Sequence, residues 1–386
     1  MNVSNFSESM NWTGSTGNET EHYFNPEGGY ENWVPMSEEP IYEVPPHQVI
    51  ILSFCYGSIS VAAVLGNGLV IWVIATSRRM RSVTNYYIAN LALADIVIGL
   101  FAIPFEFQSA LLQRWIFPAF LCSFCPFVKV ISVSVSVFTL AAIAVDRHRA
   151  ILTPFTARVS KVQFKLVISF IWLVSGLMGA PYLFAMGLVK MDNAGDEYMY
   201  CYHVNLSKET MLVYHGTLVL LQYLVPLTII TWVYARMGLA LWGATAPGNA
   251  QTERDANIMR NKKKVIKMLV IVVALFALCW LPLQTYNILQ NVFPEINTFR
   301  YINIIWFSFD WLAMSNSCYN PFIYGIYNEK FKREFQMRLR MPCTKQIKRS
   351  EPLNRELSGL ESSRFEWRRN STINSKSSKL TSISLQ

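Results

Sequence analysis

The sequence predicts an all-α membrane protein: a seven-transmembrane helix bundle followed by a short amphipathic eighth helix. Only 15% of its 386 residues are charged, against roughly a quarter in an ordinary soluble chain. Seven stretches stay apolar over the length of about 20 residues that a helix needs to cross a hydrocarbon core about 30 Å thick. Barrel strands would be about ten residues long with alternating polarity, unlike these uniform stretches. The seven stretches are 49–75, 86–112, 119–151, 163–186, 210–240, 263–290 and 301–327.

The two ends of the chain differ in charge, and this difference predicts the orientation. Residues 1–48 contain eight glutamates and no Lys or Arg, whereas residues 328–386 contain fourteen Lys and Arg against six Glu. The loop after the first stretch carries Arg78, Arg79 and Arg81. Short loops rich in Lys and Arg stay in the cytoplasm. We therefore expect a multi-pass protein of the plasma membrane with its N-terminus extracellular and its C-terminus cytoplasmic.

Residues 1–48 form a polar, acidic segment that we expect to be extracellular and glycosylated. It contains four Asn-X-Ser/Thr sequons, and a fifth lies in the second outside loop. A sequon is used only on the outside of the membrane, so the match at Asn370 in the cytoplasmic tail is attributed to chance. The predicted N-glycosylation sites are Asn2, Asn5, Asn11, Asn18 and Asn205.

The segment after the seventh stretch predicts a helix on the inner membrane surface. In residues 328–343, Phe331, Phe335 and Leu339 recur at helical spacing with basic residues between them. This pattern is typical of an amphipathic helix that contacts membrane lipid. Cys343 follows it as a candidate palmitoylation site, with an ordinary free thiol as the alternative. Residues 344–386 are rich in Ser, Thr and basic residues, which predicts a disordered cytoplasmic tail with phosphorylation sites.

The cysteine positions suggest one disulfide outside the membrane. Cys122 opens the third stretch, and Cys201 lies in the second outside loop. Both would face an oxidising compartment, and a bond between them would tie the loop over the bundle. Cys125, one turn below Cys122, is a competing partner.

One short motif per stretch, in a fixed order, carries a family resemblance. Together the motifs resemble the rhodopsin-like G-protein-coupled receptors over about residues 49–343. They are "GNGLV" at 66–70, "NLALAD" at 90–95, "DRHRAI" at 146–151, Trp172, Pro226, "CWLP" at 279–282 and "NPFIY" at 320–324.

Within that superfamily the chain is similar to invertebrate neuropeptide receptors. The seventh stretch, "FRYINIIWFSFDWLAMSNSCYNPFIYGIYNEKFKREF", looks most like the arthropod leucokinin (myokinin) receptors. That resemblance implies a short peptide ligand ending in Phe-X-X-Trp-Gly-amide and signalling through a Gq-class heterotrimeric G protein, phospholipase C and calcium release. It also implies arrestin and receptor kinases as partners of the tail. The run "RRMRSVTNYYIANLALAD" is similar to the tachykinin and neuropeptide Y receptors, so a ligand of that kind is the alternative.

Polar residues inside the stretches are expensive in lipid and usually mark function. In related receptors the matching positions line a pocket for an allosteric sodium ion, the one cofactor or metal that the resemblance implies. The alternative is a polar network that only packs helices. The predicted sodium pocket is formed by Asp95, Ser136, Asn316 and Asn320.

The resemblance also assigns residues to activation and to the G protein. The expected activation switch comprises Trp280, Pro282, Asn320, Pro321, Tyr324 and, as partner of Tyr324, Tyr234. The expected G-protein contacts are Asp146, Arg147, Pro154 and Phe155. The sixth stretch begins Asn-Lys-Lys-Lys, with no acid to hold Arg147, so an ionic latch between the third and sixth helices is not expected.

The helical rise predicts a ligand level. Counted from Asp95, Cys122 and Pro321 at about 1.5 Å per residue, Glu106, Lys129 and Asp310 fall at the same height in the outer half of the membrane. They could contact a peptide or form a purely structural salt bridge. Aromatic and amide groups suited to an amidated peptide lie near this level. These further candidate ligand-binding residues are Gln222, Gln284, Asn287 and Trp306.

Other classes of protein make demands that the sequence does not meet. An opsin needs a Schiff-base lysine in the seventh stretch, and residues 301–327 contain none. An amine receptor needs an acid where Lys129 stands. We find no nucleotide loop, metal-ligand cluster or internal repeat, which argues against an enzyme, a transporter or a nucleic-acid partner, and no filter-like segment for a channel.

Overall fold

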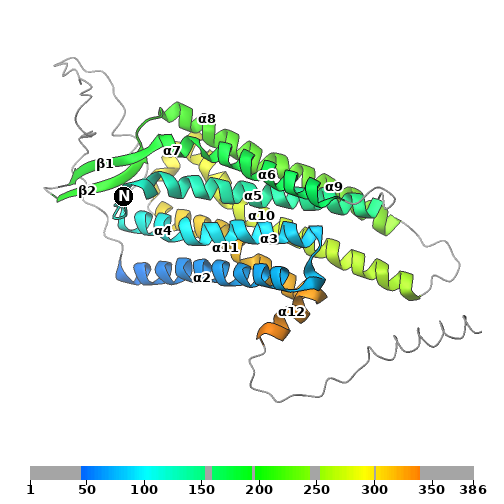
Figure 1. Cartoon of the computed structure of the whole chain (residues 1–386). Helices are drawn as coiled ribbons and strands as arrows, with labels where there is room; N and C mark the ends of the chain where they lie inside the picture. Colours follow the sequence, from blue (N-terminus) through cyan, green and yellow to red (C-terminus); the bar gives the residue numbers. More distant parts are fainter. Residues whose placement is uncertain (1–44, 153–158, 194–195, 244–252, 300, 340–386) are drawn as a thin grey trace, which may run out of the picture. The chain divides into compact units, whose positions relative to one another are not determined.

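The computed structural model describes residues 45–152, 159–193, 196–243, 253–299 and 301–339 (Figure 1). Within this part, the segment up to Gln336 is one compact unit. Several predicted features lie outside the described residues and stay predictions. They are the sequons at Asn2, Asn5, Asn11 and Asn18, the contacts at Pro154 and Phe155, the modification of Cys343 and the tail 344–386.

The described helices follow the predicted stretches in chain order. The first three stretches are α2 (Pro46–Thr76), then α3 (Val83–Phe101) with α4 (Ile103–Leu112), then α5 (Ala119–Leu152). The fourth stretch is α6 (Lys161–Gly179) with α7 (Pro181–Ala185). The fifth is α8 (Lys208–Leu218), followed by the π-helical turn η2 (Val219–Leu224) and α9 (Val225–Gly243). The last are α10 (Glu253–Val292), α11 (Ile302–Tyr327) and the short α12 (Glu329–Leu339); the 3₁₀ turns are η1 (Arg78–Met80) and η3 (Pro294–Thr298).

Six of these helical segments are long and apolar enough to cross a membrane, judged by length and composition. The seventh, α11, has the length, but polar residues such as Asp310, Asn316 and Asn320 lower its average hydropathy. All three side chains are buried. A polar side chain inside a helix bundle is tolerated when it faces the protein interior rather than lipid. The polarity of α11 therefore fits a helix that is largely enclosed by its neighbours.

Prolines account for the interruptions in the helices. Pro104, near the start of α4, has no N–H, and its ring would clash with the preceding turn; here α3 ends and α4 begins. Pro181 does the same between α6 and α7. Pro226 follows the wide turn η2 at the start of α9. Such π-turns re-aim side chains at functional sites, and this one turns Gln222 and Tyr223 into the interior.

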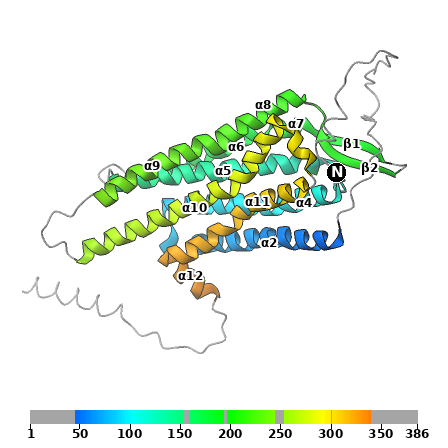
Figure 2. The same ribbon diagram turned by 180° about the vertical axis from the view of Figure 1, so that it is seen from behind.

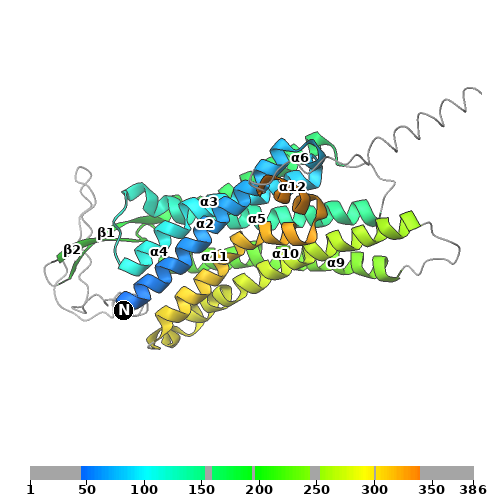
Figure 3. The ribbon, with the colours of Figure 1, turned by 90° about the horizontal axis from the view of Figure 1, so that it is seen from below.

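The helices pack around one large core, and two smaller clusters of buried residues are separate from it. Seen from two further sides, α11 lies between α2 and α10, and α5 runs through the middle of the bundle (Figures 2 and 3). Fully buried members of the core include Tyr56, Phe276 and Tyr324. The end of the bundle near α4 and α7 is called the hairpin end below, and the opposite end, where α12 packs, is called the α12 end.

Two antiparallel strands at the hairpin end were not predicted. β1 (Met186–Asn193) and β2 (Asp196–His203) pair from Met186 opposite His203 to Asn193 opposite Asp196. A second departure is the start of α10 at Glu253, about ten residues before the predicted sixth stretch. The apolar run marks only the part of a helix that lipid would cover, so a polar extension of the same helix leaves no hydropathy signal.

The amphipathic helix after the seventh stretch is present as α12. Its residue Phe331 is buried, and its ring lies 5.5 Å from that of Tyr324 in α11. Glu334 is also buried and accepts a hydrogen bond of 2.9 Å from the Ser77 hydroxyl after α2. These contacts fasten α12 to the end of the bundle.

Candidate functional site

Three charged side chains from three helices meet at the hairpin end. Glu106 stands in the first turn of α4, just after the break at Pro104, while Lys129 comes from α5 and Asp310 from α11. The Lys129 Nζ lies 2.6 Å from Oε2 of Glu106 and 3.4 Å from Oδ1 of Asp310. The side chain of Asp310 is only 8% exposed. The three groups therefore lie at a shared height, as the helical rise indicates, and form one cluster, called the ion cluster below; their contact with a ligand stays a prediction.

Tyr56, a residue that the sequence analysis missed, completes the ion cluster from α2. Its hydroxyl lies within hydrogen-bond distance of two acceptors, the Phe307 carbonyl oxygen at 2.8 Å and Oδ2 of Asp310 at 3.1 Å. The ring stacks on Phe107 with centroids 4.3 Å apart. A phenol in an apolar span needs a partner when it is buried, which is the signal that could have identified it.

The other predicted ligand residues lie on η2, α10 and α11. Gln222 is buried, and its Nε2 donates to Oγ of Ser134 at 2.6 Å and to the Val130 carbonyl oxygen at 3.1 Å, so it ties η2 to α5. Gln284 and Asn287 are half-buried on α10. Trp306 is half-buried on α11, with its ring 5.2 Å from that of Phe307.

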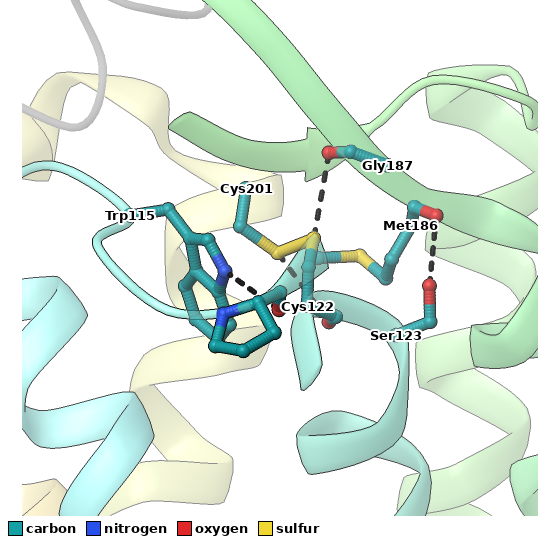
Figure 4. Close-up of a disulfide and its surroundings, with 7 residues drawn as sticks. Trp115, Cys122, Ser123, Met186, Gly187 and Cys201 are labelled. Carbon is teal, nitrogen blue, oxygen red and sulfur yellow. Dashed lines mark hydrogen bonds between the residues drawn. A yellow bond between two sulfur atoms is a disulfide. The ribbon is translucent and has the colours of Figure 1, made fainter. Parts of the chain in front are cut away.

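The β-hairpin is fastened to the bundle next to this site. Cys122 and Cys201 form the disulfide, with Cα atoms 5.6 Å apart, while the competing partner Cys125 is buried as a free thiol. Two hydrogen bonds also hold the hairpin in place. The Trp115 backbone amide donates to the Met199 carbonyl oxygen at 2.7 Å, and the Ser123 hydroxyl donates to the Met186 carbonyl oxygen at 3.0 Å. Figure 4 shows the disulfide between Trp115 and the strand that carries Met186 and Gly187. The loop is thus held against the start of α5.

An aromatic and histidine group continues from the hairpin to α8. The Tyr182 hydroxyl lies 2.8 Å from Nε2 of His215, and the rings of His203 and His215 are 6.3 Å apart. Burial lowers the pKa of His203 below its ordinary value, because the charged form loses hydration. His203 is therefore neutral at neutral pH and packs as an aromatic ring.

In the middle of the bundle, the structure brings together part of the predicted sodium pocket. The Asn320 Nδ2 donates to Oδ2 of the buried Asp95 at 2.9 Å. Ser136 and Asn316 are buried as well. Asn67, which the sequence analysis did not select, donates to the Ser317 carbonyl at 2.8 Å, and its own Oδ1 is buried with no hydrogen-bond partner among the described residues. A carboxylate and an unpaired amide oxygen are the type of ligand that a small hard cation prefers, so the residues present fit sodium.

At the α12 end, Arg147 is held by its own helix and by α3. Its Nη2 lies 2.6 Å from Oδ2 of Asp146, and Arg147 also donates to the Thr84 hydroxyl. The Thr84 hydroxyl donates in turn to Oδ2 of Asp146 at 3.2 Å. On α10, Lys264 lies 3.8 Å from Glu329 of α12. Among the described residues, Arg147 thus has an acidic partner on its own helix, α5.

The predicted switch residues occupy the interior between the two ends. Trp280 is buried on α10, with its ring 6.1 Å from that of Phe276, and Pro282 lies inside the same helix. Tyr324 is fully buried against α12, and Tyr234 is buried on α9. Pro321 lies inside α11. Of the six predicted switch residues, Pro282 is half-buried and the other five are buried.

Comparison with known proteins identifies the family to which this arrangement belongs. Residues 66–324 match the 7 transmembrane receptor (rhodopsin family) profile. The chain belongs to the rhodopsin family of seven-transmembrane receptors. Because members of this family have seven spans, α11 is identified as the seventh, although its composition alone does not mark it as one. Members of the family are receptors rather than enzymes.

The relatives of this rhodopsin-family receptor include receptors for peptides. It is 35% identical to the human substance-K receptor, over 78% of this chain and 75% of the relative. It is 35% identical to the tachykinin-like peptides receptor 99D of Drosophila melanogaster and 37% identical to the RYamide receptor of the same species, over 77% and 76% of this chain. The match spans only 58% and 64% of the length of those two relatives. The receptor is thus about equally similar to receptors named for different peptides.

Proposed function

We propose that this chain is a cell-surface receptor for a short amidated neuropeptide and activates a heterotrimeric G protein. The observation that carries the proposal is the ion cluster, in which side chains from α4, α5 and α11 meet beside the disulfide-anchored hairpin. A peptide has both backbone amides and side chains to satisfy, so it needs a site with several polar groups supplied by different elements. An amine receptor would instead present a free acid where Lys129 stands.

The proposed orientation places the hairpin end outside the cell and the α12 end in the cytoplasm. Lys and Arg gather at the α12 end, in the loop that contains Arg78, Arg79 and Arg81 and in α12 itself. Basic loops remain cytoplasmic. With this orientation Asn205 is exposed on the outside for glycosylation, and α12 lies at the inner leaflet. Arg147 and Asp146 then face the G protein, which we propose to be of the Gq class.

For the ligand, the relatives favour a tachykinin-like or RYamide-like peptide over a leucokinin-like one. Their printed names describe receptors for the first two kinds, and none of the relatives given above is named for leucokinin. The resemblance of the seventh stretch to leucokinin receptors remains a second candidate. All three ligands are short peptides, and aromatic surfaces such as Trp306 next to the ion cluster would suit an aromatic residue of any of them.

Cytosolic calcium in cells expressing the full chain tests the proposal and separates the ligands. Tachykinin-like, RYamide-like and Phe-X-X-Trp-Gly-amide peptides would be applied over a range of concentrations to cells with matched surface expression. We expect at least one peptide class to release calcium, with the tachykinin-like or RYamide-like peptides acting at the lowest concentration. Untransfected cells serve as the control. If no peptide released calcium from cells with normal surface expression of the receptor, the proposed function would be contradicted.

A further inference from the structure

The ion cluster carries one more negative than positive charge. Glu106 and Asp310 are acids, Lys129 is the base between them, and Tyr56 contributes a neutral hydroxyl. The side chains of Lys129 and Glu106 are 25% and 23% exposed, and that of Asp310 is 8% exposed. A carboxylate withdrawn from water is costly unless another charge compensates it. The cluster is therefore short of one cation.

Asp310 is the acid without a full counter-charge, because both of its partners have a closer contact elsewhere. Lys129 Nζ lies 2.6 Å from Glu106 but 3.4 Å from Asp310. The Tyr56 hydroxyl lies 2.8 Å from the Phe307 carbonyl oxygen but 3.1 Å from Asp310. Each partner could release Asp310 and keep the shorter of its two contacts. Both carboxylate oxygens of Asp310 would then be free for a new donor without leaving Lys129 or Tyr56 unpaired.

The same helix, α5, carries a buried hydroxyl close in sequence to Lys129. Ser132 is one helical turn from Lys129 and only 2% exposed, and its Oγ has no hydrogen-bond partner among the described residues. Buried hydroxyls in proteins nearly always have a partner, either protein or water. The unpaired Oγ thus lies on the same helix as Lys129, whose ammonium group contacts both acids of the ion cluster.

We propose that the activating peptide brings a cationic group, a guanidinium or an ammonium, that pairs with Asp310 and turns Lys129 fully toward Glu106. The inference rests on the proposed peptide-receptor function and adds to it the charge of the ligand. With the cation of the peptide present, the four charged groups form two neutral pairs, Lys129 with Glu106 and the cation with Asp310. A guanidinium suits the position best, because its planar fork can bind both oxygens of one carboxylate.

Two matched pools of amidated nonapeptides test this inference. Each pool contains Phe and Trp at varied positions; one carries a single arginine and the other a citrulline, its neutral isostere, in the same place. The readouts are the thermal shift of the purified full-length receptor and G-protein activation. For the wild type we expect the arginine pool to act at a roughly ten- to hundredfold lower concentration, the size of one charge-assisted hydrogen-bonded contact.

Three variants decide whether Asp310 is the partner. The preference for arginine should disappear in Asp310→Asn. It should shrink in Glu106→Gln, where Lys129 is free to neutralise Asp310. Tyr56→Phe is the matched control, because it removes a neutral contact of Asp310 and leaves the charge excess, so the preference should persist. If Asp310→Asn does not fold, the opposite behaviour expected of Glu106→Gln and Tyr56→Phe still tests the inference.

The outcomes separate this inference from the proposed function. Equal action of the two pools on the wild type, or an unchanged arginine preference in Asp310→Asn, would overturn the inference and leave the peptide receptor standing. If neither pool acts on the folded wild-type receptor, the inference fails, and the proposed function is decided separately by the calcium response to the peptide panel.

Discussion

Replacing Lys129 with methionine would remove the ammonium group that contacts both acids of the ion cluster while keeping most of the side-chain volume. Glu106 and Asp310 would then face each other across the hairpin end of α4, α5 and α11 without that counter-charge. Two partly desolvated carboxylates repel each other and are no longer compensated. We expect Lys129→Met to destabilise the receptor and to loosen this end of the bundle.

The contact distances give the size of the effect. At an effective dielectric constant of about 20, unit charges attract by about 6 kcal/mol at 2.6 Å and about 5 kcal/mol at 3.4 Å. Most of this is offset by the desolvation of the three groups, so the net loss is the value of roughly 3–5 kcal/mol found when one partner of a buried pair is removed. Because Lys129 and Glu106 remain about a quarter exposed, the lower end, about 3 kcal/mol, is expected.

Thermal unfolding of purified full-length variants measures this loss. Lys129→Arg is the matched control, because it keeps the charge and should melt close to the wild type. The triple variant Lys129→Met, Glu106→Gln, Asp310→Asn removes all three charges together and should recover most of the lost stability. If Lys129→Met melted at the wild-type temperature, the three groups would not be electrostatically coupled and the account of the ion cluster would be wrong.

Three further substitutions test other parts of the structure. Asn90→Leu leaves Nε1 of the half-buried Trp172 without the acceptor it now has at 2.9 Å. The loss should cost about 1–3 kcal/mol and lower the melting temperature, and an unchanged melting temperature would show that the bond contributes nothing. Asp95→Asn should abolish any rise in melting temperature that sodium chloride produces over potassium chloride in the wild type, whereas a retained sodium effect would place the ion elsewhere. Lys264→Ala should leave stability unchanged, because its pair with Glu329 is 3.8 Å long and exposed and such pairs contribute about 0–1 kcal/mol; a clear loss of stability would contradict that.

Helical rise predicted the height of the ion cluster but not its hydrogen bonds. Glu106, Lys129 and Asp310 share a level because the rise per residue is nearly constant. The rotation of each helix about its axis depends on breaks such as that at Pro104 and on the π-turn before Pro226. These local departures decided that Gln222 bonds to α5 rather than joining the cluster. They also depend on neighbouring helices, so single-sequence periodicity does not contain them.

The β-hairpin had a signal in the sequence that the search for apolar stretches passed over. Tyr198, Tyr200 and Tyr202 alternate along β2, which is the two-residue period of a strand. The letters "DNAGD" at 192–196, which include the end of β1 and the start of β2, are typical of a turn sequence. The partner of Asp310 was missed for a different reason. Tyr56 and Asp310 are 254 residues apart, and only the packed bundle shows that α2 lies against α11.

Peptide-stimulated nucleotide exchange tests the central claim most directly. The purified full-length receptor in lipid nanodiscs would be mixed with a purified Gq-class heterotrimer and each peptide of the panel. At least one amidated peptide should accelerate exchange with the wild type, and Arg147→Ala, which removes the side chain held between Asp146 and Thr84, should abolish the acceleration. Exchange that no peptide accelerates, although the receptor is folded, would contradict the claim that this chain is a peptide receptor.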